Sequence, residues 1–347
     1  MKALLRNLIG AIASCYLCTA SAQVSNTSTQ EKTQKPKQVS LLFVGDMVLD
    51  DLPGKAIERG EDPFAAFETI FASADIRVGN LECVIATTGK ATEKNFTFRA
   101  HPRVIPLLKK HFDAISLANN HSGDYGPAAF SEMLKLLKEQ KMAHFGGGNN
   151  LSEAHRPHII EKNGLRIALL GYDEFMPRSF EANTNKAGVA WSEDEQVVAD
   201  IKAARQQYQA DIVIPFMHWG WENEMNANQR QRKLARIMID AGADAVVGGH
   251  PHVIQDTETY RGKPIIYSIG NFMMDALDNE AQTLGWAVRL HIDQYGVNAW
   301  DTRIAKINPE GIPSPKLEAQ SPCWNKLTGL SNTCKKTSAT LTKPIAQ

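Results

Sequence analysis

Short apolar runs alternate with amphipathic stretches along the first two thirds of the chain. Six of these runs have the length of a buried strand: Val39–Val44, Ile76–Val78, Phe112–Ala118, Arg166–Gly171, Asp211–Met217 and Asp244–Gly248. Between them, apolar residues recur with helical spacing, which predicts helices near residues 63–74, 127–140, 193–208 and 226–240. Because strands that alternate with helices pair in parallel, the pattern predicts an α/β sandwich.

The last third of the chain has a different pattern. Strand-like runs at residues 264–269, 286–292 and 297–307 follow one another with few helical signals between them. They predict an antiparallel portion that completes a second sheet. Residues 309–347 are rich in Pro, Ser, Lys and Thr, which predicts a loosely held tail. Cys323 and Cys334 lie in this tail at a spacing suited to a small disulfide loop.

The first 22 residues have the pattern of a secretory signal. Lys2 and Arg6 precede a short apolar segment, and Ala20-Ser21-Ala22 resembles a small-residue cleavage site. An alternative is a lipoprotein signal ending before Cys15, which we rank second because its apolar segment would be very short. Both interpretations predict export to the periplasm or the cell exterior. Residues 23–38 are polar and predict a flexible linker, so the folded domain is expected over residues 39–308.

The composition is that of an ordinary globular protein. The 347 residues include 38 Lys and Arg against 38 Asp and Glu, with 43% apolar residues. A protein that binds nucleic acid or anionic membranes over a broad surface would show a basic excess, so no nucleic-acid partner is expected. The chain also lacks the Gly-x-Ser-x-Gly, His-Glu-x-x-His and Walker-type motifs of other hydrolases and nucleotide-binding proteins.

Polar residues follow the apolar runs at the points where the strands are expected to end. In an open α/β sheet the carboxyl ends of the strands meet at one edge, so these residues are expected to converge. Taken singly, Asp46 is better explained as a turn residue. A packed imidazole is the usual fate of a histidine such as His218, but Gly220 and Glu222 nearby suggest instead a loop in which it is exposed to a cleft. The strongest single signal is His250-Pro251-His252, because two imidazoles on a rigid loop can reach adjacent metal positions.

Taken together, the strand ends carry a donor set typical of a metal site. Imidazole, carboxylate and amide oxygen are normal ligands of Zn, Mn, Fe and Ni. The sequence therefore predicts one or two divalent ions at the sheet edge, without distinguishing the metal. The residues concerned are Asp46, Asn80, Glu82, Asn120, His121, His218, His250 and His252.

Taken in order along the chain, these motifs resemble those of a known family. From Val39 to Phe272 the order of its motifs is similar to that of the CapA family, capsule-synthesis proteins associated with poly-γ-glutamate and a branch of the calcineurin-like metallophosphoesterase superfamily. The resemblance implies a four-layer α/β/β/α sandwich with a metal centre at one sheet edge. It rests on Gly45-Asp46, Asn80-Leu81-Glu82, Asn120-His121-Ser122-Gly123-Asp124-Tyr125-Gly126, His218-Trp219-Gly220-Trp221-Glu222, Gly249-His250-Pro251-His252-Val253 and Ser268-Ile269-Gly270-Asn271-Phe272.

The resemblance also implies individual roles. A first metal would be bound by Asp46 and His252, and Glu82 or Asn80 would stand where the superfamily has a bridging aspartate. A second metal would be bound by Asn120, His218 and His250. His121 would be the acid–base residue.

Two positions depart from the superfamily pattern. Val48 stands where the superfamily has a histidine, and the bridging position carries Glu82 or Asn80 in place of aspartate. A single metal, or a centre completed by Glu222 or Asp124, therefore remains open beside a full dinuclear centre.

The predicted activity is metal-dependent hydrolysis in poly-γ-glutamate or capsule metabolism. A bound ion polarises the substrate and activates water, and His121 can protonate the leaving group, with Asp124 and Glu222 as further catalytic candidates. The substrate is expected to be a phosphoester or a linkage in an anionic envelope polymer such as poly-γ-glutamate. Candidate substrate contacts are Arg99 and His101, in a segment (96–102) expected to fold over the cleft, and Asn271.

Two alternatives remain open from the sequence. The protein could be a non-catalytic accessory protein that binds poly-γ-glutamate or membrane components of its synthase. It could also hold a metal that only stabilises the fold.

Overall fold

The computed structural model describes residues 37–175, 178–316 and 321–332. Its larger sheet contains β1 (Gln38–Met47), β2 (Ile76–Leu81), β5 (Ala114–Ser116), β6 (His144–Phe145), β15 (Asn271–Met273), β16 (Leu284–Asp293), β17 (Gly296–Ile307), β18 (Pro313–Pro315), β19 (Cys323–Asn325) and β20 (Gly329–Ser331). The strand order is β20-β19-β17-β16-β1-β2-β5-β6, and β15 and β18 pair with β1 and β17. The pairs β1–β2, β2–β5 and β5–β6 are parallel.

The smaller sheet has six strands in the order β13-β14-β12-β11-β9-β8. These are β8 (His158–Lys162), β9 (Leu165–Asp173), β11 (Ile212–His218), β12 (Val246–Gly249), β13 (Thr257–Tyr260) and β14 (Lys263–Ile266). The central strands β9, β11, β12 and β14 are parallel. Two short pairs complete the strands: β3 (Val84–Ile85) with β4 (Arg99–Ala100), and β7 (Gly147–Gly148) with β10 (Gly188–Val189).

The helices form two groups along the chain. The first group is α1 (Asp51–Glu58), η1 (Ala65–Phe67), α2 (Glu68–Ala72), η2 (Pro102–Val104), α3 (Ile105–His111) and α4 (Gly126–Glu139). The second is α5 (Leu151–Ala154), η3 (Arg178–Phe180), α6 (Asp194–Gln206), α7 (Gln229–Ala241) and η4 (Ala281–Thr283). Asn228 and Gln231 form a reciprocal capping box that begins α7, and Gly242 at φ 122° ends it.

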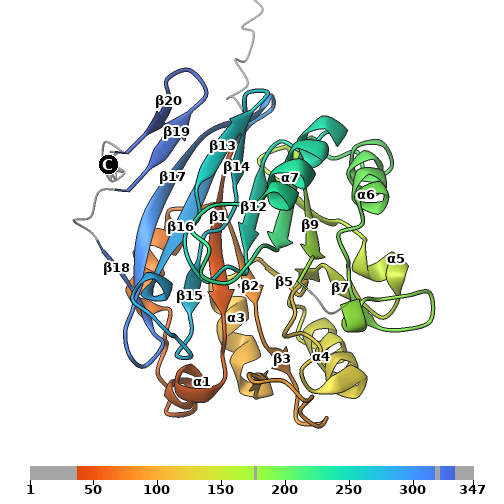
Figure 1. Ribbon diagram of the computed structural model, residues 1–347, viewed down its shortest axis with the longest axis vertical. Helices are drawn as coiled ribbons and strands as arrows, with labels where there is room; N and C mark the ends of the chain where they lie inside the picture. The colour runs from red at the N-terminus through yellow and green to blue at the C-terminus, as the bar shows by residue number, and fades with distance from the viewer. Residues whose placement is uncertain (1–36, 176–177, 317–320, 333–347) are drawn as a thin grey trace, which may run out of the picture. The chain divides into compact units, whose positions relative to one another are not determined.

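Three apolar cores hold four layers together (Figure 1). Between the sheets, side chains of β1 and β11 meet, and the rings of Phe43 and Phe216 pack edge to face at 5.2 Å. The neighbouring residue Leu42 points to the opposite face of β1, into the core shared with α2, α3 and α4. The outer face of the smaller sheet packs against α6 and α7. The predicted four-layer α/β/β/α sandwich is therefore confirmed.

The antiparallel strands of the last third join a different sheet from the one predicted. β16 pairs with β1, and β17 pairs with β16, so both extend the sheet that contains the first strand. Only β13 and β14 complete the smaller sheet. The apolar run of β16 places Leu290 and Val288 in the same intersheet core as β1, which favours this pairing.

The prediction of a loose tail is wrong where residues 313–315, 323–325 and 329–331 form strands. β18 and β19 both pair with β17, and β20 continues the sheet beyond β19. Trp324 is buried and lies opposite Trp300 in this pairing, so one large apolar side chain anchors an otherwise polar segment. Cys334 lies outside the described residues, as do the expected signal (1–22) and all but the last two residues of the expected linker (23–38).

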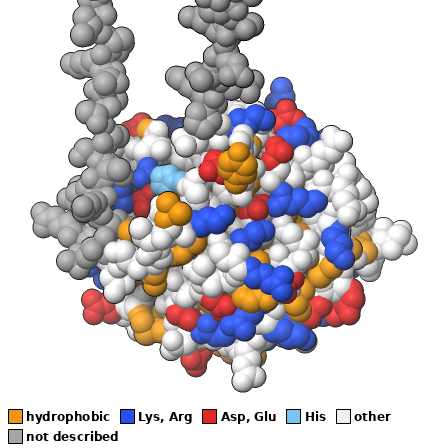
Figure 2. Space-filling view, turned by 90° about the horizontal axis from the view of Figure 1, so that it is seen from above, with side chains coloured by type: hydrophobic (Ala, Val, Ile, Leu, Met, Phe, Trp, Pro, Cys, Tyr) orange, Lys and Arg blue, Asp and Glu red, His pale blue; other side chains and the backbone are white. Residues whose placement is uncertain are grey.

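The surface mixes charges of both signs. Figure 2 shows Lys and Arg interspersed with Asp and Glu over one face of the molecule. Many of these groups form ion pairs, such as that of Arg178 with Glu181 at 2.8 Å. Among the described residues, no helix is both long and apolar enough to cross a membrane.

Replacing Trp324 by alanine tests whether the last strands belong to the folded domain. Because the Trp324 side chain is buried in the core between the two sheets, Trp324→Ala should lower the free energy of unfolding by about 3 kcal/mol. Leu327→Ala, in the exposed turn of the same hairpin, is the matched control and should change it by less than about 0.5 kcal/mol. Denaturant unfolding measures the change in free energy for both variants. If Trp324→Ala changed it as little as Leu327→Ala does, the last strands would not belong to the folded domain.

Candidate metal centre

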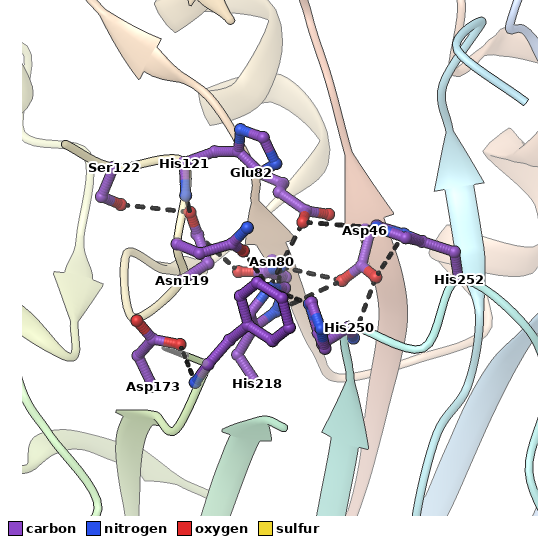
Figure 3. Close-up of polar contacts among 12 residues, drawn as sticks. Asp46, Asn80, Glu82, Asn119, His121, Ser122, Asp173, His218, His250 and His252 are labelled. Atoms are coloured by element: carbon purple, nitrogen blue, oxygen red, sulfur yellow. Dashed lines mark hydrogen bonds and ion pairs between the residues drawn. The ribbon is translucent and has the colours of Figure 1, made fainter. Parts of the chain in front are cut away.

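The carboxyl ends of strands from both sheets meet at one place (Figure 3). β1 ends with Asp46 and Met47, and Asp46 lies in register with Asn80 of β2. In the other sheet β11 ends with His218, which lies in register with Gly249 at the end of β12. The two sheets thus bring their strand ends together, as expected for parallel strands.

Five side chains converge there into two groups of ligand atoms. Glu82, His218 and His250 form one group, and Asp46, Glu82 and His252 form the other. Within each group the ligand atoms lie within 4.8 Å of one another, and all five residues are buried. Glu82 belongs to both groups, so its carboxylate lies where a bridging ligand would.

The donor atoms fit a divalent cation. Both carboxylate oxygens of Glu82 and the Nε2 atom of His250 are buried and have no hydrogen-bond partner among the described residues. Buried polar atoms of this kind are rare in folded proteins, because losing water without gaining a partner is unfavourable. A cation would satisfy all three atoms, and the mixture of imidazole and carboxylate suits the transition metals expected from the sequence.

Without an ion, the histidines compensate the carboxylate charge unequally. Burial tends to lower the pKa of His252, but Glu82 and the Asp46 carboxylate, 3.5 Å from His252 Nδ1, outweigh burial and raise it to about 10. Burial together with the charges of His218 and His252 holds the pKa of His250 well below its ordinary value. His252 is therefore protonated near neutral pH, whereas His250 is neutral.

Amide side chains orient the ligands. Asn80 Nδ2 donates to Asp46 Oδ1 at 2.8 Å, and Asn80 Oδ1 accepts from Asn119 Nδ2 at 3.0 Å. Both ends of the Asn80 side chain are thus hydrogen-bonded within the protein. Of the two candidates for the bridging position, Glu82 is therefore the one whose oxygens are available to both ligand groups. Asn120 Oδ1 lies 2.7 Å from His218 Nε2, so it is adjacent to the ligand group of Glu82, His218 and His250.

The loop of the two neighbouring histidines is held in an unusual conformation. His250 and His252 have φ angles of 90° and 59°, a region that side-chain-bearing residues rarely adopt. The loop approaches β1 closely: His250 N donates to Asp46 Oδ2 at 3.1 Å, and a Cβ at Gly249 would come within 2.8 Å of Asp46 Oδ1. Only glycine at this position lets the histidines reach the carboxylates.

His121 lies beside Glu82 (Figure 3). Its Nδ1 lies 2.7 Å from Asp124 Oδ2, and Asp124 also accepts from Lys94 Nζ at 2.6 Å and from Phe98 N at 2.9 Å. These partners occupy the Asp124 carboxylate. Asp124 therefore does not complete the metal centre, contrary to one alternative, but it orients His121.

Four predicted site residues have other surroundings than expected. The guanidinium of Arg99 donates to the carbonyls of Thr88 and Gly89, and His101 is exposed and caps η2 through its Nδ1. Glu222 is exposed and does not complete the metal centre. Arg99 begins the two-residue strand β4, and His101 and Glu222 lie outside the strands and helices, so local periodicity could not specify their surroundings.

The fourth, Asn271, positions a ligand instead of contacting substrate. Its Oδ1 lies 2.9 Å from His252 Nδ1, and its Nδ2 donates to the carbonyls of His252 and Gln282. These contacts engage both ends of the amide.

Two residues of the site, Asp173 and Phe175, were not predicted from the sequence. Asp173, the last residue of β9, is buried in register with His218, and burial raises its pKa to about 6. It follows an apolar strand as Asp46 does, so the same rule would have found it had the strand been extended by two residues. The ring of Phe175 covers His250 at a centroid distance of 4.0 Å.

Metal binding should release protons. Because only unprotonated imidazole binds a metal, His252 must lose its proton, and affinity should rise about tenfold per pH unit between about pH 7 and pH 9. Calorimetric titration of zinc or manganese in buffers of different ionisation enthalpy measures this release. His252→Asn should reduce it, whereas His158→Asn, at a half-buried imidazole of β8, should not. Binding to the wild type without proton release would contradict the description of His252.

Comparison with known proteins identifies the family. Residues 40–276 match the family described as bacterial capsule synthesis protein PGA_cap. The PGA biosynthesis protein CapA of Bacillus subtilis is 33% identical over 297 residues, which cover 82% of this chain and 75% of that protein. The capsule biosynthesis protein CapA of Bacillus anthracis is 28% identical, covering 83% and 72%. A probable polyglutamine synthesis accessory protein of Mycobacterium tuberculosis is 31% identical, covering 58% and 56%. The chain therefore belongs to the PGA_cap family of bacterial capsule synthesis proteins.

Proposed function

We propose that this protein is an exported, metal-dependent hydrolase that cleaves a bond in an anionic polymer of the cell envelope, with poly-γ-glutamate as the first candidate. The observation that carries the proposal is Glu82, a buried carboxylate shared by two groups of ligand atoms beside an oriented histidine. The names of the relatives, which refer to PGA and capsule biosynthesis, support the choice of polymer. The signal-like residues 1–22 support export.

The ligands divide between two ion positions. Asp46 and His252 would hold one ion and His218, His250 and Asn120 the other, with Glu82 between them. A bound divalent ion supplies Lewis acidity towards the substrate and makes water a better nucleophile near neutral pH.

The residues of the chain supply orientation and a proton. Asp124 engages Nδ1 of His121, so Nε2 is the ring nitrogen that can donate to a leaving group. Lys94 and the backbone of Phe98 hold Asp124 in place, so the imidazole orientation is set before substrate binds. An amide or phosphoester needs such a proton, because its leaving group is a poor one when unprotonated.

A second candidate is a non-catalytic accessory role. The relatives are named for synthesis, and the mycobacterial one is named a probable accessory protein. In that role the protein would bind poly-γ-glutamate or the synthase without cleaving the polymer.

His121→Ala separates the two candidates. Turnover should fall by about a hundredfold to ten-thousandfold while metal content stays unchanged, because His121 donates a proton and binds no ion. His101→Ala, at an exposed histidine outside the site, is the control and should retain turnover within about twofold. The measurements are chain shortening of poly-γ-glutamate and hydrolysis of a chromogenic phosphodiester. If the metal-loaded wild type were as inert as His121→Ala on both substrates, the accessory role would replace the hydrolase proposal.

A further inference from the structure

The helices α4 and α5 and the strand β7 lie at one side of the molecule (Figure 1). Residues of these elements line a groove. It consists of two cavities of about 520 and 500 Å³ that share Arg156 and Pro157 in their walls. The first cavity lies between the end of α4 and β8, and the second lies between α5 and α6. None of the residues assigned above to the metal centre lines either cavity.

Arg156, at the junction of the cavities, differs from the other arginines that the structure describes. Each of the others forms an ion pair with a carboxylate or, in the case of Arg99, donates to backbone carbonyls. Within the described residues, the guanidinium of Arg156 has no hydrogen bond, ion pair or ring contact. It is exposed and lines both cavities, so its donors are available to a ligand.

The carboxylates of the groove, in contrast, already have partners. Glu153 accepts from the backbone and the side chain of Asn149 at 3.0 and 2.7 Å. Asp200 accepts from Tyr172 at 3.0 Å and Gln196 at 2.7 Å, and it lies 2.7 Å from Nδ1 of His155. Both acids are thus engaged with the protein.

Two further cations lie in the first cavity. Lys138 and Lys141 line it and form no ion pair with any described residue. The imidazoles of His144 and His158 also line this cavity, and His155 lines the second, where Asp200 occupies one of its ring nitrogens. Hydrogen bonds from Asn149 and, after them, the charges of Arg156 and Lys138 lower the pKa of Glu153, so these two cations act on one groove carboxylate without contacting it. The groove therefore offers the hydrogen-bond donors of three cations to a ligand, whereas its carboxylates already accept hydrogen bonds.

We propose that this groove binds a stretch of an extended polycarboxylate chain, the same poly-γ-glutamate that the proposed function names as substrate. The inference rests on that proposed function for the identity of the polymer. Lys138 and Lys141 line the first cavity, and Arg156 lines both cavities at their junction, so the cations follow a line that suits a chain with a carboxylate on every residue better than a single small anion. A bound polymer long enough to reach the metal centre would be presented there at a raised local concentration.

Binding of a fluorescent γ-glutamyl oligomer to the full chain, stripped of metal with a chelator, tests this assignment. Arg156→Gln should weaken binding about tenfold, the effect of losing one charged hydrogen-bonding partner. The double variant Lys138→Gln with Lys141→Gln should weaken it as well, and added salt should weaken binding to the wild type.

Lys326→Gln is the matched control. It also removes one exposed positive charge, but from the β19–β20 turn, at the opposite edge of the larger sheet from β6. It should change affinity by less than about twofold. Equal weakening by Arg156→Gln and Lys326→Gln would mean diffuse attraction and would overturn the groove assignment.

Two more results would overturn the proposal. One is failure of the metal-free wild type to bind the oligomer, and the other is equally tight binding of uncharged polyglutamine. Neither result would count against the hydrolase proposal. That proposal is tested separately, by hydrolysis of the chromogenic phosphodiester by the metal-loaded protein. That hydrolysis should be unchanged in Arg156→Gln, and its loss would contradict a groove separate from the metal centre.

Discussion

The arrangement at the strand ends depends on one buried carboxylate without a hydrogen-bond partner. Glu82 is inaccessible to solvent, and its nearest charged neighbours are His218 at 3.3 Å and His252 at 4.0 Å. Taking a carboxylate out of water is strongly unfavourable unless charges nearby compensate it. In the metal-free protein the protonated imidazole of His252 provides part of this compensation. Bound cations would replace that proton, so the same five side chains, which form an ion-pair cluster without cations, would then act as ligands.

The surrounding fold is built to hold these groups in place. The positive φ angles of His250 and His252 and the close approach of Gly249 to Asp46 are unfavourable in isolation, and the packed sheets on either side maintain them. Asn80 is hydrogen-bonded to Asp46, and Asn271 to His252. Asn119 in turn donates a hydrogen bond to Asn80. Such outer contacts set the orientation of ligands before an ion arrives.

Periodicity in the sequence predicted most of the architecture. Strands buried on both faces produce continuous apolar runs, and for this reason β1, β9, β11 and β12 were recognisable. The pairing of β16 with β1 joins residues far apart in the chain, which local patterns do not encode. The last strands were missed because Trp324 is a single anchor in a segment whose average composition is polar.

The site was predictable where its residues follow strands. The convergence of Asp46, Glu82, His218, His250 and His252 follows from parallel pairing, because every such strand delivers its last residues to the same edge. Arg99 lies in the short strand β4, and His101 and Glu222 lie on loops, so their environment depends on contacts that no local motif specifies. Asp173 was missed for a simpler reason, since the predicted strand ended at Gly171.

The central claim is that Glu82 lies between two cation positions. Crystals grown with manganese or zinc, with diffraction recorded at the absorption edge of the metal, would locate the ions by anomalous scattering. Two peaks in contact with Glu82 are expected, one beside Asp46 and His252 and the other beside His218 and His250. Peaks that avoid Glu82, or no peak at a saturating metal concentration, would contradict the claim.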